Sequence, residues 1–173
     1  MMINARGLSP RRRWLMPLMV LMAGLLAGGC RSKLPPDYDP IAMRLYLEAR
    51  DSEQGIAVQM PLTGTVVAVK AKALFTEADF LNAEVVQVDL GKCLLLQMTP
   101  AAARDLYRMT GTNQGSRLVL TGNDVPLGIR RIDRALDEGN LLIFLELPDD
   151  ELDDLVRRVK QTSLVVQKEI ARK

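Results

Sequence analysis

The stretch of sequence that decides the fold reads AEVVQVDLGKCLLLQMTPAAARDLYRM, at residues 83–109. Apolar and polar residues alternate over 83–89, and an apolar run follows over 93–98, which together predict a β-hairpin. Thr99 and Pro100 then predict the start of a helix, because a threonine hydroxyl can cap the first turn and proline fits the first helical position. A hairpin that runs directly into a helix favours a domain of the α+β class.

Further elements are expected on both sides of this stretch. Alternating or β-branched residues predict strands at 43–49, 56–60, 65–70, 117–121, 125–127 and 141–147. The apolar spacing over 129–136 predicts another helix, closed by Gly139 as its C-cap, and a last helix is expected from Pro148 onwards. The expectation is a single α+β domain at residues 41–173, with a mostly antiparallel sheet and about three helices packed on one face.

The first thirty residues have the order of a secretory signal. Three arginines at 11–13 precede an apolar run over 14–26, and small residues lead up to Cys30. The run is shorter than the roughly 20 residues that a membrane span needs, and Pro17 interrupts it. A signal peptide is therefore expected, and an uncleaved anchor with an incidental cysteine is the alternative.

The segment LAGGC at residues 26–30 resembles the lipobox of bacterial lipoproteins. The resemblance implies that residues 1–29 are a signal peptide, cut between Gly29 and Cys30, and that the Cys30 thiol carries a covalent lipid. It departs from the usual pattern at Ala27, where lipoproteins prefer leucine. The chain would then be held on the periplasmic face of a bacterial membrane by its lipid.

Residues 30–40 are expected to form a short tether. Three prolines in its last six residues favour an extended chain, and polyproline geometry over about ten residues reaches roughly 30 Å. The folded domain would therefore stay close to the membrane. Arg31 stands where an aspartate would retain many lipoproteins in the inner membrane, so the outer membrane is favoured by analogy.

Composition argues against several classes of function. The chain has no histidine, which removes the usual general base near neutral pH and the commonest metal ligand. Residues 1–29 hold four of the 23 basic residues and none of the 21 acidic ones, so the remainder has a net charge of −2 and no electrostatic reason to bind nucleic acid. Cys93 is expected to be a small core residue, and the acids at 149–154 a solvated helix start rather than a calcium loop. We expect no catalytic residue, no metal and no cofactor besides the lipid.

The order of turn residues over about 74–159 resembles the head of the first periplasmic domain of SecD, an accessory subunit of the bacterial protein translocase. Two motifs come first, one before the predicted hairpin and one at the end of the following helix. They are Leu74, Thr76, Asp79 and Ala83, and then Thr110, Asn113, Gly115 and Leu118. The family's next places, a helix ending in glycine, an apolar strand and a loop before the last helix, are held by Gly139, Leu141–Leu145 and Pro148–Glu151. The resemblance implies a head module that contacts translocating polypeptide, without the membrane helices that couple SecD to proton flow.

Six residues are candidates for contact with a partner. They lie in a polar glycine loop, in a turn and on the predicted helix over 129–136, and they are Asn113, Gly115, Asp124, Arg130, Arg131 and Arg134. The three arginines are expected near one another, where they could meet an acidic partner or a lipid head group. A solvated face is the alternative.

These observations favour a non-enzymatic binding or adaptor module, tethered to the membrane, that holds exported polypeptide or an export-related partner by backbone pairing and apolar contacts. A structural or assembly lipoprotein of the cell envelope with one dedicated protein partner is the alternative. An enzyme would need a cleft with two convergent carboxylates.

Overall fold

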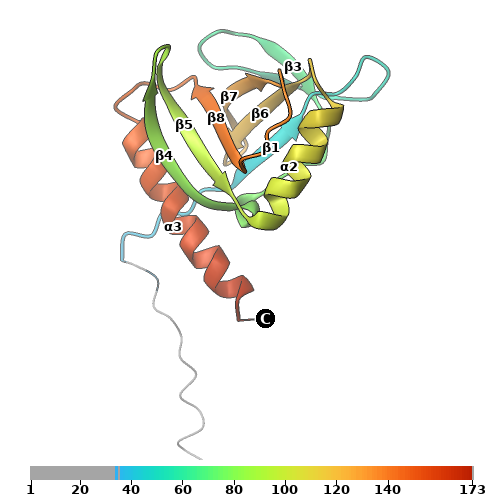
Figure 1. Cartoon of the computed structure of the whole chain (residues 1–173). Helices are drawn as coiled ribbons and strands as arrows, with labels where there is room; N and C mark the ends of the chain where they lie inside the picture. The colour runs from blue at the N-terminus through green and yellow to red at the C-terminus, as the bar shows by residue number, and fades with distance from the viewer. Residues whose placement is uncertain (1–33, 35, 173) are drawn as a thin grey trace, which may run out of the picture. The chain divides into compact units, whose positions relative to one another are not determined.

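A curled, antiparallel sheet of six strands forms the centre of the domain, in the order β1-β6-β7-β8-β5-β4 (Figure 1). The strands are β1 (Met43–Leu47), β4 (Phe80–Val88), β5 (Gly91–Met98), β6 (Arg117–Gly122), β7 (Val125–Arg131) and β8 (Asn140–Leu145). This computed structural model describes residue 34 and residues 36–172. The predicted signal peptide (1–29), its cleavage between Gly29 and Cys30, and the lipid on Cys30 lie outside the described residues.

The predicted hairpin and the helix after it are confirmed. β4 and β5 pair in antiparallel register, and α2 (Pro100–Thr112) follows β5 at once. Thr99 has an extended backbone, and its Oγ1 accepts a hydrogen bond from the backbone N–H of Ala102 at 3.3 Å. The hydroxyl therefore satisfies one of the unpaired amides of the first helical turn.

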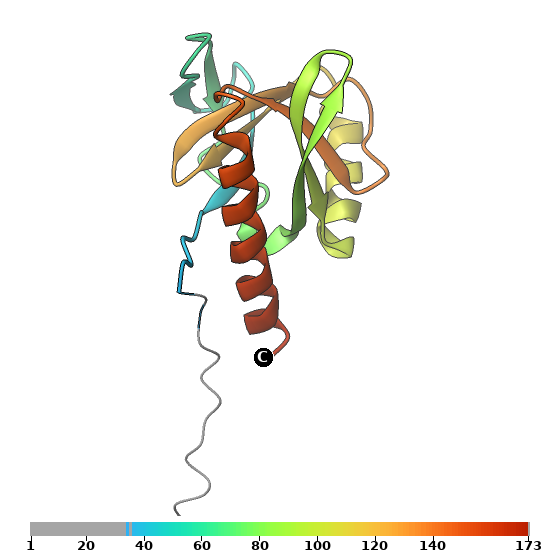
Figure 2. The ribbon, with the colours of Figure 1, turned by 90° about the vertical axis from the view of Figure 1, so that its left-hand side faces the viewer.

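The core lies between the sheet and both α-helices. α3 (Leu152–Ile170) lies along β4 (Figure 2). Leu94 of β5, Leu106 of α2 and Leu155 of α3 belong to one buried cluster, to which every strand of the large sheet contributes. We call the side of the sheet that faces this cluster the inner face. The α+β class and the antiparallel sheet were thus predicted correctly.

The helix predicted over 129–136 is wrong, because β7 occupies the first part of this region. β7 lies between β6 and β8, so that Ile129 is opposite Val119 on one side and Phe144 on the other. Two neighbouring strands each need a backbone partner, and this long-range pairing outweighs the local apolar spacing that suggested a helix. Gly139, with φ of 69°, precedes β8 and caps no helix.

Within residues 36–172 the helices are α2, α3 and the short 3-10 helix η2 (Glu77–Asp79), where about three packed helices were expected. The last helix begins at Leu152 and not at Pro148, and Asp153 and Asp154 lie in its first turn, where the helix dipole favours acids. None of the described helices combines the length and the apolar character needed to cross a membrane.

A small separate hairpin covers part of the opposite side of the sheet, which we call the outer face. It consists of β2 (Ile56–Gln59) and β3 (Val66–Val69) and lies at the top of Figure 1. Val67 and Val69 of this hairpin form a second buried cluster with Met60 and with Val119 of β6. The domain therefore has a large core on the inner face and a smaller one beneath the hairpin.

The chain segment that includes β3 and continues to Phe75 also pairs with the free edge of β1, the edge that does not pair with β6. The backbone N–H of Leu45 donates to the carbonyl of Phe75 at 2.9 Å, and Lys70 N–H donates to the carbonyl of Leu47 at 2.8 Å. The segment from β3 to Phe75 thus pairs with a strand that would otherwise present unpaired backbone groups to solvent.

Candidate functional site

The large sheet is weakly joined between β7 and β8, and we call this junction the seam. Two residue pairs join the strands, Gly128 with Leu145 and Ile129 with Phe144, and just after β8 the backbone N–H of Glu146 donates to the carbonyl of Leu127 at 2.6 Å. At the other end of the seam a side chain crosses the gap, because Nη1 of Arg130 donates a hydrogen bond to the backbone carbonyl of Leu142 at 2.5 Å. The guanidinium therefore replaces part of a backbone ladder, and the strands are held together without continuous pairing.

Apolar side chains become more exposed as the outer face crosses the seam. Tyr46, Val119, Ile129 and Phe144 lie opposite one another on four successive strands. Val119 is fully buried beneath the β2–β3 hairpin, Ile129 is half-buried, and Phe144 is 43% exposed. Because the hairpin ends before the seam, the apolar row continues into an uncovered surface.

A shallow groove of about 310 Å³ lies on this uncovered surface. Its floor is apolar and includes Cys93, Ile129, Leu142 and Phe144, and its rim includes Arg130, Arg131 and Asp133. We call it the seam groove. A cavity of about 70 Å³ beside it is lined by Arg130 and Leu142 again, together with Arg134, Asp137 and Glu138. An apolar floor can accept the apolar side chains of a bound peptide. Charged groups of both signs at the rim can form hydrogen bonds with the polar backbone of that peptide.

The three predicted arginines are brought together at the seam, although no helix carries them. Arg130 and Arg131 lie on β7, and Arg134 lies in the loop that follows. Arg130 lines both the seam groove and the smaller cavity, Arg131 lines the first and Arg134 the second. Their proximity was therefore predicted for the wrong secondary structure.

The other three candidates are separated by the length of β6. Asn113 ends α2, where its backbone N–H and its Nδ2 both donate to the carbonyl of Met109. Gly115, with φ of 88°, donates its N–H to the carbonyl of Ile132 at 2.7 Å, next to Arg131. Asp124 lies at the other end of β6. One partner site therefore does not include all six residues.

Asp124 belongs to the turn between β6 and β7. It adopts a φ of 64°, and its Oδ1 lies 3.2 Å from Nη1 of Arg44. Neighbouring Asn123, with φ of 50°, accepts a hydrogen bond from Ala42 N–H at 2.9 Å through its Oδ1. Asparagine and aspartate tolerate the left-handed conformation of such a turn, so both residues have a structural role here.

The thiol of Cys93 lies at the floor of the seam groove and is 2% exposed. Burial raises its pKa, and the charge of Arg130 opposes this only in part. The thiol is therefore protonated near neutral pH and a weak nucleophile. The prediction that Cys93 is a small apolar residue of the fold agrees with its burial.

An ion pair fixes the start of β6 close to the predicted glycine loop. Glu48 accepts a hydrogen bond from the backbone N–H of Arg117 at 2.8 Å, and its other oxygen accepts from Nε of the same residue at 3.0 Å. Arg117 lowers the pKa of the Glu48 carboxyl through these bonds, against the opposing effect of burial. The pair holds together the ends of β1 and β6.

Replacing Glu48 by glutamine should remove a pH-dependent part of the stability. A carboxyl whose folded pKa is lowered stabilises the fold above its unfolded pKa of about 4.3, and this stabilisation is lost as pH falls through the folded value. At pH 7 we expect Glu48→Gln to lower the free energy of unfolding by about 1 kcal/mol, because both side chains are partly exposed. At pH 3 the difference from wild type should shrink. Urea denaturation at both pH values measures it, with Glu138→Gln as the exposed control; an unchanged difference would contradict the assignment.

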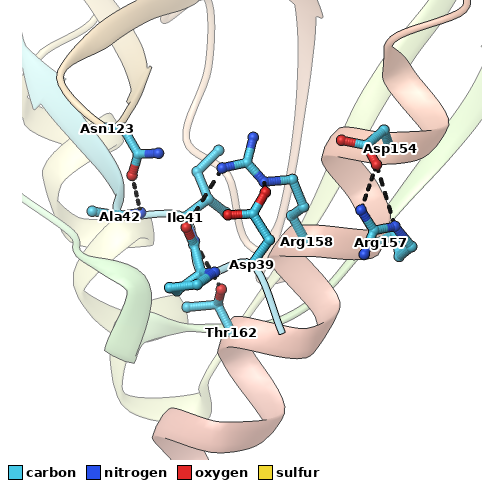
Figure 3. A network of polar contacts seen from close by, with 9 residues as sticks. Asp39, Ile41, Ala42, Asn123, Asp154, Arg157, Arg158 and Thr162 are labelled. Carbon is cyan, nitrogen blue, oxygen red and sulfur yellow. Dashed lines mark hydrogen bonds and ion pairs between the residues drawn. The ribbon is translucent and has the colours of Figure 1, made fainter. Parts of the chain in front are cut away.

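The chain enters the domain through a set of polar contacts with α3 (Figure 3). Oδ2 of Asp39 lies 2.7 Å from Nε of Arg158, and the backbone N–H of Ile41 donates to Oγ1 of Thr162 at 3.0 Å. Both residues of the second bond are buried. The last residues of the predicted tether are thus bonded to α3 at the point where the chain enters the domain.

These contacts and the apolar floor of the seam groove were not predicted from the sequence. Residues 141–145, LLIFL, are apolar at every position, and a half-buried strand would alternate. The run therefore carried a signal for a second apolar face, on which Leu142 and Phe144 lie. No comparable sequence signal marks Thr162 and Arg158. Helical periodicity places both beside the buried stripe of α3, but it does not indicate that they bind the end of the tether.

The acidic cluster at 149–154 is divided among separate contacts. Asp149 lies 3.2 Å from Nζ of Lys92, and Asp154 pairs with Arg157 one helical turn later. Within the described part of the chain, no three carboxylate, histidine or cysteine side chains gather in a way that could hold a metal ion.

Comparison with solved structures finds the same fold in SecDF. The chain matches the crystal structure of SecDF in a super-membrane-facing form with 17% identity and a TM-score of 0.56, over 71% of this chain and 19% of that one. It matches a second structure, from work on SecDF as a membrane component that enhances protein export, with 16% identity and a TM-score of 0.57, over 94% of this chain and 73% of that one. The chain therefore spans about a fifth of the first of these proteins.

The resemblance to the SecD head that the turn residues suggested is confirmed as a likeness of fold. At this level of identity the likeness concerns the fold alone. No model of a known protein family matches the chain, and no curated protein matches it either.

Proposed function

We propose that this chain is a lipid-anchored, non-enzymatic binding module of the bacterial periplasm, which holds polypeptide near a membrane in support of protein export. The observation that carries the proposal is the seam groove, on a fold shared with SecDF. One matched SecDF structure is described as that of a component that enhances protein export.

The chemistry of the seam groove supports the binding of extended polypeptide of varied sequence. Leu142 and Phe144 offer apolar surface that is partly exposed, and Arg130 and Asp133 at the rim offer a donor and an acceptor for polar groups. Apolar contacts of this kind favour binding without demanding one sequence. A binding role without catalysis also agrees with a chain that has no histidine and whose Cys93 has a raised pKa.

The lipid on Cys30 would hold this groove close to the membrane. The proposal rests on the lipobox-like residues 26–30 and on the short distance along the chain from Cys30 to the fixed residues Asp39 and Ile41. The outer membrane is the proposed location, because Arg31 follows the cysteine in place of aspartate. The substitution Cys30→Ser should leave an unlipidated precursor. Normal lipid labelling of this variant would contradict the proposal that Cys30 carries the lipid.

Photo-crosslinking in cells tests the binding role. A photo-reactive phenylalanine analogue replaces Phe144 in the seam groove or, as a control, Tyr107, which is 51% exposed on α2 and belongs to the inner side of the domain. We expect a broad range of exported proteins to be captured at position 144 and few at position 107. Adding Leu142→Asp should weaken capture at 144 about tenfold, since a charge in the groove floor costs more than about 1 kcal/mol.

The alternative function predicts a different result from the same experiment. A structural or assembly lipoprotein with one dedicated partner would yield a single dominant envelope protein at position 144. Equal capture at positions 144 and 107 would contradict both functions of the seam groove.

A further inference from the structure

The C-terminal turns of α3 extend past the sheet and expose apolar side chains. Figures 1 and 2 show this end of the helix beyond the strands, opposite the β4–β5 turn. Val159 is 1% exposed, whereas Ile170, three helical turns later on the same side, is 50% exposed. Gln167 Nε2 still bonds the carbonyl of Ala78 in η2, at 2.8 Å. The apolar stripe of α3 therefore continues beyond the surface that it covers.

A second exposed apolar side chain, Leu164, lies on another side of these turns between basic residues. Leu164 is 59% exposed, and Lys160 and Lys168 lie four residues before and after it, on the same side of the helix. An exposed leucine between lysines is typical of helices that lie at a lipid surface, because the long side chains place their ammonium groups among the head groups.

The fixed end of the tether lies on the same helix. Thr162, which accepts the hydrogen bond from Ile41, is two residues from Leu164, and Arg158 binds Asp39 one turn earlier. Pro36 follows Cys30 by six positions along the chain, a span of at most roughly 20 Å when extended. A membrane that holds Cys30 is therefore within reach of the end of α3.

We propose that the C-terminal end of α3 points into the lipid surface to which the chain is tethered, so that Ile170 and Leu164, on different sides of the helix, both lie among the head groups and Lys160 and Lys168 face anionic lipids. This contact rests on the lipid anchor of the proposed function. It gives the domain a second, non-covalent point of attachment, so that the anchored chain keeps one orientation.

Single-tryptophan fluorescence of the lipidated chain in vesicles tests the contact. Trp14, the only tryptophan of the sequence, lies in the signal peptide that lipoprotein processing would remove, so Leu164→Trp or Ile170→Trp supplies the sole reporter, on one or another side of the helix. Leu90→Trp, in the β4–β5 turn where Leu90 is 85% exposed, is the matched control. The variants are purified from cells, reconstituted into vesicles of phosphatidylethanolamine and phosphatidylglycerol, and exposed to spin-labelled lipids that quench nearby tryptophan.

We expect lipid quenching at positions 164 and 170 to exceed that at position 90 at least about twofold, with the difference reduced by Lys168→Glu. Flotation with the vesicles but equal quenching at all three positions would overturn the contact and leave the anchor intact. Failure to float would overturn the anchor itself, and with it this contact.

Discussion

Replacing Gly128 by alanine should destabilise the domain by about 2–3 kcal/mol, among the larger costs of crowding a packed interior. A Cβ at this position would lie 2.4 Å from the backbone oxygen of Phe144 and 3.3 Å from the Cα of Leu145. Both neighbours are main-chain atoms of β8, so no rotation of a side chain relieves the clash. Since Gly128 belongs to one of the residue pairs that join β7 to β8, the two strands must separate at this point, and the floor of the seam groove moves with them.

Gly111→Ala is the matched control for this prediction. Gly111 lies within α2, and the nearest atom to an added Cβ is the Cβ of Ala135 at 3.8 Å, an ordinary contact. Alanine should there raise stability by about 0.5–1 kcal/mol, because glycine costs that much in a helix. Urea denaturation followed by circular dichroism measures both variants. Equal midpoints for Gly128→Ala and wild type would mean that the seam strands can part without cost.

Thr110→Val should cost about 1–3 kcal/mol although it preserves the shape of the side chain. Oγ1 of Thr110 accepts a hydrogen bond from the backbone N–H of Leu136 at 2.9 Å and donates one to the carbonyl of Leu106 at 2.7 Å. Thr110 is fully buried, so valine would leave the Leu136 amide without a partner and out of reach of water. This single hydroxyl connects α2 with the loop that follows β7.

Thr112→Val is the control, because it removes a hydroxyl that bonds a carbonyl of its own helix but accepts no bond from the Leu136 amide. Thr112 also donates to a helix carbonyl, that of Arg108 at 3.1 Å, but its side chain is exposed. We expect a change within about 0.5 kcal/mol for this variant. Amide hydrogen exchange adds a local measurement, since the Leu136 amide should exchange faster in Thr110→Val and not in Thr112→Val. Unchanged protection at Leu136 would show that its hydrogen bond does not depend on Thr110.

The sequence predicted those elements whose signals are local. The hairpin and helix of residues 83–109 rest on alternation, a capping hydroxyl and a proline, all of which act within a few residues. The region 129–136 was misassigned because its apolar spacing suits a helix, whereas its structure is decided by β6 and β8, which lie far away in sequence. Leu136 reaches the large buried cluster from a loop, where its backbone N–H is bonded to Thr110, and not from the face of a helix.

The candidate site was predicted only in its charged part. Arg130, Arg131 and Arg134 are close in sequence, so their proximity follows for almost any local structure. The apolar floor depends on which part of the outer face the β2–β3 hairpin leaves uncovered, and that depends on the pairing of strands that are remote in sequence. Local sequence patterns do not indicate which strands pair or which part of the outer face stays uncovered.

Under the lipid anchor that we propose, the closed edge of β1 has a consequence for chains crowded side by side on a membrane. A lipid-anchored protein diffuses in two dimensions, where copies meet often, and an unpaired strand would invite them to join edge to edge into aggregates. The backbone groups of Leu45 and Leu47 are already bonded to the segment that ends at Phe75, so this side of the sheet offers no template for another copy. Copies that collide at the membrane therefore cannot polymerise by pairing through β1.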